Sequence, residues 1–127
     1  MKNQKIKILI AEDDSFLAQM YSEKLEAEGF TVVLATNGVE AIDRMKLEKP
    51  DLILLDLLMP KKDGFEVLQE KIADKNIKSI PVIVLTNLSQ NEDIKRCYDL
   101  GANDFMIKAY FIPAEIISKI KVLLNIE

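Results

Sequence analysis

Short apolar runs rich in Ile, Val and Leu alternate along the chain with segments of helical period, and this alternation restricts the fold more than any other feature. Four runs are clear, namely Ile6–Ala11, Leu52–Leu55, Val82–Leu85 and Phe105–Ile107, and a weaker fifth run covers Thr31–Ala35. Runs that are apolar throughout are typical of parallel strands buried on both faces. The alternation therefore predicts an α/β fold of three layers, with five parallel strands between helices.

The intervening segments have the apolar spacing and the end signals of amphipathic helices. Apolar residues recur at intervals of three and four, as in Leu17, Met20, Tyr21 and Leu25, or in Ile116, Ile120, Leu123 and Leu124. Helix starts are indicated by Asp63 with Glu66, Ser89 with Glu92, Asn37-Gly38 and Pro113. Gly29 and Gly101 stand where two helices are expected to stop.

Length and composition restrict the organisation of the chain and its chemistry. The 127 residues fit one domain, and we expect residues 1–127 to form it, since the sequence has no repeat, linker or composition shift. There is no histidine, which rules out Ser-His-Asp and Cys-His nucleophiles and His-ligated zinc. The single cysteine, Cys97, cannot form an internal disulfide and suits a reducing compartment.

The charge pattern favours a protein partner over nucleic acid. The chain has 17 basic and 21 acidic residues, a net charge of −4, and its lysines are scattered rather than clustered. This argues against direct nucleic-acid binding through a basic face. No apolar run approaches the roughly 18 residues that span a bilayer, so we expect no membrane association and a cytoplasmic location.

Charged and hydroxyl side chains follow four of the five predicted strands. The acidic run Glu12-Asp13-Asp14 follows the first strand, Asp56 the third, Thr86 the fourth and Lys108 the fifth. In a parallel α/β sheet, ligands bind outside the carboxyl ends of the strands. The sequence therefore predicts that these residues meet at one edge of the sheet.

Each of these residues has a simpler interpretation when it is considered alone. Asp13 and Asp14 suit the cap of the following helix, Thr86 suits a strand or a cap, and Lys108 suits a solvated surface. Asp56, however, interrupts an apolar run, where a carboxylate is costly unless it is partnered. Three carboxylates about 4 Å apart repel by roughly 4 kcal/mol per pair at an effective dielectric of 20. Such a cluster predicts a lysine and Mg²⁺, which prefers oxygen ligands.

The ordered set of these motifs resembles the receiver domain of two-component response regulators. The resemblance rests on Asp13-Asp14, on Asp56 followed by Met59-Pro60 and Asp63-Gly64, and on Thr86 and Lys108, and it covers essentially the whole chain. It implies a flavodoxin-like, doubly wound parallel sheet with the strand order 2-1-3-4-5 and five helices.

The resemblance also implies a role for each site residue. Asp56 would be the phosphoacceptor, whose carboxylate attacks phosphorus to give an aspartyl phosphate. Asp13, Asp14, Asp56 and the backbone carbonyl of Leu58 would hold Mg²⁺. Lys108 would then pair with the phosphoryl oxygens.

Two further residues would convert phosphorylation into a change of surface. The hydroxyl of Thr86 would move to bond a phosphoryl oxygen, and Phe105 would be an aromatic switch residue, although an aromatic in a central strand is also a common core residue. The resemblance implies a histidine kinase or a histidine phosphotransfer protein as the donor, and this chain cannot be its own donor because it has no histidine. The output face would comprise the fourth helix, fifth strand and fifth helix, in a monomer or a phosphorylation-dependent dimer. The protein would thus be a switch rather than a metabolic enzyme.

Four residues depart from the family's usual pattern. Ala109 replaces a proline that is expected after a cis peptide bond, and a non-proline cis bond costs about 2.5–4 kcal/mol. Leu58 and Leu88 are apolar at positions where the family modulates attack of water on the phosphoryl group. Asn87 is bulkier than the small residue usual there. We expect Leu58 and Leu88 to lengthen the lifetime of the aspartyl phosphate, whereas crowding by Asn87 would slow phosphorylation.

Three alternatives use the same fold differently. A degenerate receiver would act as an interaction module without phosphorylation. A Mg²⁺-dependent phosphatase with Asp56 as nucleophile, of the haloacid-dehalogenase type, needs a second Asp two residues later, where this chain has Leu58. A nucleotide-binding domain needs a glycine-rich loop after the first strand, where this chain has Glu12-Asp13-Asp14-Ser15.

Overall fold

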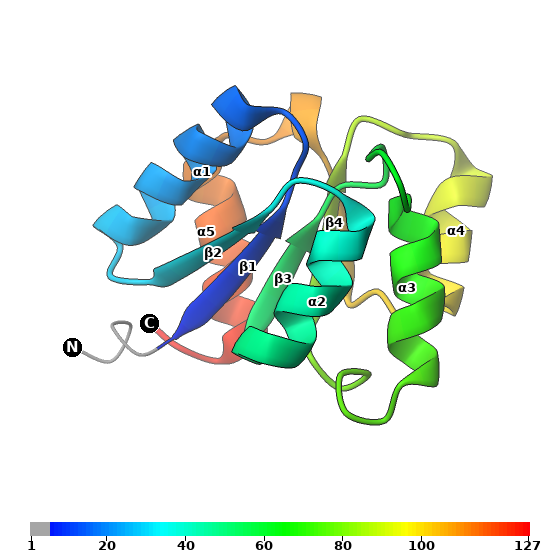
Figure 1. The fold of residues 1–127 in the computed structure, drawn as a ribbon. Helices are drawn as coiled ribbons and strands as arrows, with labels where there is room; N and C mark the ends of the chain where they lie inside the picture. Colours follow the sequence, from blue (N-terminus) through cyan, green and yellow to red (C-terminus); the bar gives the residue numbers. More distant parts are fainter. Residues whose placement is uncertain (1–5) are drawn as a thin grey trace.

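The computed structural model describes residues 6–127 and contains one five-stranded parallel sheet with the order β2-β1-β3-β4-β5 (Figure 1). The strands are β1 (Lys7–Ala11), β2 (Thr31–Ala35), β3 (Leu52–Leu55), β4 (Val82–Thr86) and β5 (Asp104–Ile107). The helices are α1 (Ser15–Ala27), α2 (Gly38–Glu48), α3 (Gly64–Ala73), α4 (Asn91–Asp99) and α5 (Pro113–Leu124). This is the flavodoxin-like arrangement predicted from the sequence.

The helices cover both faces of the sheet, with α1 and α5 on one face and α2, α3 and α4 on the other (Figure 1). Successive strand residues point to opposite faces, so each strand contributes to two separate cores. In β3, Ile53 and Leu55 pack in the core beneath α2 to α4, whereas Leu52 and Leu54 pack in the core beneath α1 and α5. This two-sided burial explains why β3 is apolar throughout.

Most of the predicted helix ends are confirmed. Asp63 and Glu66 form a reciprocal capping box at the start of α3, Asn37 caps α2, and Pro113 is the first residue of α5. Gly29 and Gly101 follow α1 and α4 with φ values of 96° and 97°, a conformation that favours glycine.

The predicted start of α4 at Ser89 is wrong. Gln90 has the extended N-cap backbone, with ψ of 139°, and the helix begins at Asn91 without a side-chain cap. Glu92 and Asp93 fall in the first turn, where acidic side chains interact favourably with the positive end of the helix dipole. The dipole therefore stabilises this end in place of the capping box.

Within residues 6–127, no helix has both the length and the apolar character needed to cross a membrane.

Candidate functional site

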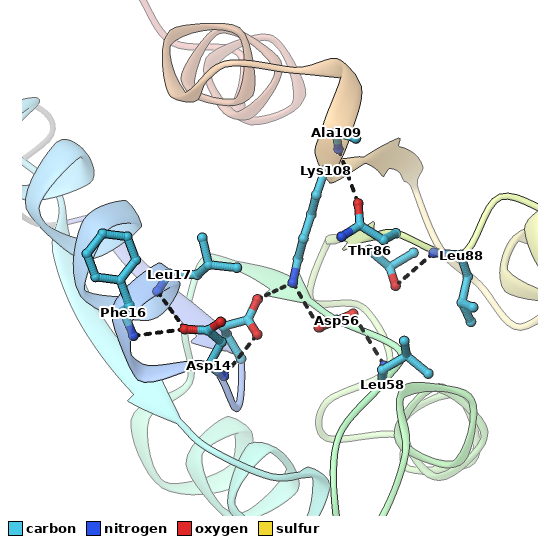
Figure 2. Close-up of polar contacts among 11 residues, drawn as sticks. Asp14, Phe16, Leu17, Asp56, Leu58, Thr86, Leu88, Lys108 and Ala109 are labelled. Atoms are coloured by element: carbon cyan, nitrogen blue, oxygen red, sulfur yellow. Dashed lines mark hydrogen bonds and ion pairs between the residues drawn. The ribbon is translucent and has the colours of Figure 1, made fainter.

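Strand pairing brings the candidate residues to the carboxyl edge of the sheet. Ala11 at the end of β1 pairs with Leu55 at the end of β3, and Thr86 at the end of β4 pairs with Ile107 in β5. The amide of Asp56 donates to the carbonyl of Ala11 at 3.1 Å and continues the ladder by one residue. The side chains that follow β1, β3 and β5 therefore meet above this edge (Figure 2).

Asp56 is buried at this edge, and both of its carboxylate oxygens have partners. Oδ2 accepts a hydrogen bond from Nζ of Lys108 at 2.9 Å, and Oδ1 accepts one from the amide of Leu58 at 3.3 Å. The side chain of Asp56 is only 7% exposed, so its charge depends on these partners. This fulfils the sequence expectation that a carboxylate in an apolar run must be paired.

Lys108 joins two buried carboxylates, because its ammonium group also donates to Glu12. Burial lowers the pKa of Lys108, but the hydrogen bonds to Glu12 and Asp56 and the charges of both outweigh burial, so the pKa lies above its usual value. Burial raises the pKa of Glu12, and the hydrogen bonds from Lys108 and the Asp14 amide offset only part of that rise. The lysine is therefore held in its charged form.

Glu12, Asp13 and Asp56 each offer a carboxylate oxygen, and these oxygens lie within 4.8 Å of one another. Glu12 and Asp56 are buried and Asp13 is exposed, so the cluster opens to solvent on the side of Asp13. A donor set made only of carboxylates suits a hard cation that keeps several waters, such as Mg²⁺.

The structure separates the two aspartates that the sequence analysis had grouped together. Asp13 lies beside Asp56, but Asp14 is the N-cap of α1, where its Oδ1 accepts from the amides of Phe16 and Leu17 at 3.0 and 3.1 Å. Asp14 is therefore not in the carboxylate cluster, and its simpler interpretation as a cap is confirmed.

Glu12 takes the place in the cluster that was assigned to Asp14. The signal that could have identified it is its position directly after the apolar strand, where a carboxylate needs a partner as Asp56 does. The amide of Glu12 donates to the carbonyl of Ala35 at 3.0 Å, so Glu12 continues β1 and stays buried.

Thr86 and Phe105 lie on neighbouring strands near this edge. Thr86 is fully buried, and its hydroxyl accepts from the amide of Leu88 at 3.5 Å. Phe105 is half-buried and packs against the core beneath α2, α3 and α4. Phe105 therefore contacts the core without being enclosed by it.

The peptide bond between Lys108 and Ala109 is trans, because residues 6–127 contain no cis peptide bond. Lys108 nevertheless reaches Asp56. The amide of Ala109 donates to Oδ1 of Asn87 at 3.2 Å (Figure 2). The side-chain oxygen of Asn87 is therefore bonded to Ala109.

Comparison with known proteins agrees with this geometry. The family described as the response regulator receiver domain matches residues 8–121. A probable transcriptional regulator of Porphyridium aerugineum is 37% identical over 96% of this chain, which corresponds to 49% of that protein. The chain spans about half the length of the curated relatives it matches.

Solved structures give the same result. The receiver domain of a signal transduction histidine kinase from Syntrophus aciditrophicus is 36% identical, with a TM-score of 0.85, over 94% of this chain and 89% of that one. The receiver domain of a sensor histidine kinase from Pseudomonas aeruginosa has a magnesium ion coordinated in its active-site cleft. It is 28% identical, with a TM-score of 0.85, over 94% of this chain and 98% of that one. This chain therefore belongs to the receiver domain family of two-component response regulators.

Proposed function

We propose that this receiver domain accepts a phosphoryl group on Asp56 in a Mg²⁺-dependent reaction and thereby switches a protein-binding surface. The observation that carries the proposal is the pairing of buried Asp56 with Lys108 beside Glu12 and Asp13. A bond forms between a carboxylate oxygen of Asp56 and phosphorus, while the bond from phosphorus to the donor breaks. Such a transfer needs mainly positioning and neutralisation of charge, which this cluster supports.

The residues present fit a magnesium site. Asp13 and Asp56, together with the backbone carbonyl of Leu58 that the family resemblance implies, would hold the ion, with Glu12 as the third carboxylate of the cluster. The bound ion would neutralise negative charge on the phosphoryl oxygens. Support comes from the all-carboxylate donor set and from the magnesium ion in the similar receiver domain of Pseudomonas aeruginosa.

Lys108 would neutralise the remaining charge on the phosphorylated side chain. Its ammonium already contacts the Asp56 oxygen, so it needs no large movement to pair with a phosphoryl oxygen on that side chain. Thr86 would give up its contact with Leu88 and donate its hydroxyl to another phosphoryl oxygen, and the half-buried Phe105 would follow.

We infer that the donor is a histidine kinase or a histidine phosphotransfer protein, as expected for the receiver domain family. The change would be read by a downstream protein at the face formed by α4, β5 and α5. The chain would act as a switch whose chemistry is limited to its own phosphorylation and dephosphorylation.

The test is to incubate the wild type, Asp56→Asn and Asp43→Asn with acetyl phosphate and Mg²⁺ and to record intact mass. Asp43 is an exposed aspartate of α2 and serves as the matched control. We expect one added phosphoryl group on the wild type and on Asp43→Asn, and none on Asp56→Asn or in the presence of EDTA. If the wild type is unmodified and its amide NMR spectrum does not change when beryllofluoride is added, the domain is a phosphorylation-independent interaction module and the proposal is wrong.

A further inference from the structure

The loops that carry two of the site residues are joined by one hydrogen bond. Asn87 follows Thr86 at the end of β4, and Ala109 follows Lys108 after β5. The side-chain Oδ1 of Asn87 accepts from the backbone amide of Ala109 at 3.2 Å. The bond therefore spans 22 residues of sequence and lies one residue away from both Thr86 and Lys108.

We propose that Asn87 is a positioning residue that holds the backbone at Lys108 so that its ammonium group points at Asp56. This inference rests on the proposed function, since it assigns Asn87 to the same site. Asn87 does not touch the reacting atoms, and it acts through the amide of Ala109.

The path of the chain around Lys108 explains why the hydrogen bond between Asn87 and Ala109 affects the position of Lys108. Lys108–Tyr110 form a short 3₁₀ turn, and the residues around it are exposed or half-buried. Ala109 and Tyr110 are exposed, so apolar packing contributes little to the position of this turn. Glu12 and Asp56 hold the side chain of Lys108 and Phe111 packs on the core, whereas the hydrogen bond to the loop after β4 holds the exposed backbone between them.

The same bond joins the sequence neighbours of the two residues that would bind a phosphoryl group. Thr86 and Lys108 lie at the ends of neighbouring strands, β4 and β5. With Asn87 bonded to Ala109, a movement of the β4–α4 loop is transmitted to the backbone beside Lys108. The side-chain oxygen of Asn87 is directed to Ala109, and crowding of the phosphorylation site by this residue stays a prediction.

The hydrogen bond can be tested first without metal or phosphoryl group. In the wild type we expect the Ala109 amide to exchange slowly with solvent and to shift in NMR spectra of Asn87→Ala, together with Lys108. Ser89→Ala is the matched control, because Ser89 is exposed on the same loop. Unchanged Lys108 and Ala109 amides in Asn87→Ala would overturn the proposal.

The second measurement is the affinity for beryllofluoride with Mg²⁺, followed by NMR. Because the bond already exists in the unbound protein, its net value of about 0.5–1.5 kcal/mol limits the loss of affinity in Asn87→Ala to at most roughly two- to 13-fold, and Ser89→Ala should be unchanged. Ala109→Pro removes the donor, so adding Asn87→Ala to Ala109→Pro should cause no further loss. Equal losses from Asn87→Ala in both backgrounds would show that Asn87 acts otherwise and would overturn the proposal.

The outcomes separate this inference from the proposed function. If the wild type neither binds beryllofluoride nor is modified by acetyl phosphate, the proposed function is wrong, and the amide measurements still test whether Asn87 positions Lys108. If the wild type binds and the affinity of Asn87→Ala equals that of Ser89→Ala, only the role of Asn87 is wrong. Each variant is first checked for folding by its amide spectrum.

Discussion

Nζ of Lys108 lies 2.9 Å from Oδ2 of Asp56, although the two residues are 52 positions apart in the chain. The same ammonium group also pairs with Glu12, so a single lysine compensates two buried carboxylates. A charge cluster of this kind is strongly destabilised when one partner is removed, because the other charges remain buried. The stability of the domain is therefore coupled to the residues of its site.

Lys108→Ala should destabilise the metal-free protein by about 3–5 kcal/mol, because Glu12 and Asp56 are then left without their cation. Lys119→Ala is the control, since Lys119 pairs with Asp104 at 3.5 Å on the surface, where such a pair contributes about 0–1 kcal/mol. Urea unfolding of both variants measures the difference. Similar losses in the two variants would contradict the coupling of Lys108 to the buried carboxylates.

Asp13 and Asp14 should behave differently towards Mg²⁺. A ligand that binds only the folded state raises the melting temperature, so Mg²⁺ should stabilise the wild type. Asp13→Asn should lose much of this increase, because it removes one carboxylate of the cluster. Asp14→Ala should keep the Mg²⁺ response and lose about 0.5–2 kcal/mol of stability with the cap of α1. Thermal melts with and without Mg²⁺ decide this, and a lost Mg²⁺ response in Asp14→Ala would restore Asp14 to the metal site.

The sequence was sufficient to predict the sheet, its topology through the family resemblance, and the meeting of Asp56 with Lys108. It was not sufficient to decide which of the consecutive residues Glu12, Asp13 and Asp14 lie in the carboxylate cluster. Successive side chains of a strand point to opposite faces, so a difference of one residue in where β1 ends changes which of these carboxylates points into the site. The structure extends the ladder through Glu12, which buries Glu12 and leaves Asp14 to cap α1. The bond between Asn87 and Ala109 was also beyond prediction, since it depends on how two loops approach each other.

Gly38→Ala should displace the loop that follows Asp56. A Cβ at Gly38 would lie 1.9 Å from the carbonyl oxygen of Lys62, so the backbone of one segment must move. We expect a loss of about 1–3 kcal/mol and shifted amide signals from Leu58 to Lys62. Gly101→Ala is the control, since it strains a residue with φ of 97° elsewhere in the chain. Loop signals that are the same in Gly38→Ala and the wild type would contradict this packing.

Leu58→Asn should shorten the lifetime of the aspartyl phosphate. Leu58 and Leu88 line an open cleft together with Asp13, which lies beside Asp56 in the carboxylate cluster, and we expect their apolar side chains to limit the access of water to Asp56. An amide at position 58 can hydrogen-bond and orient such a water. Loss of the phosphoryl group after removal of acetyl phosphate, followed by intact mass, gives the rate. Leu47→Asn, an exposed change on α2, should leave the rate unchanged. An equal rate in Leu58→Asn and the wild type would show that Leu58 does not shield the site.

Lys71 should make the protein more stable at alkaline pH. Its side chain is buried in α3 and donates to the carbonyl of Lys78 at 2.9 Å, and burial lowers its pKa from 10.5 to about 8. Between about pH 8 and 10.5, Lys71 therefore binds more protons in the unfolded chain than in the folded protein. The contribution of Lys71 to the free energy of unfolding consequently grows as pH rises through this range and is lost as pH falls to 8. Lys71→Met should flatten this part of the profile of unfolding free energy against pH, whereas Lys75→Met, an exposed change, should not. Urea unfolding between pH 7 and 10.5 measures both profiles. Parallel curves for Lys71→Met and the wild type would contradict the lowered pKa of Lys71.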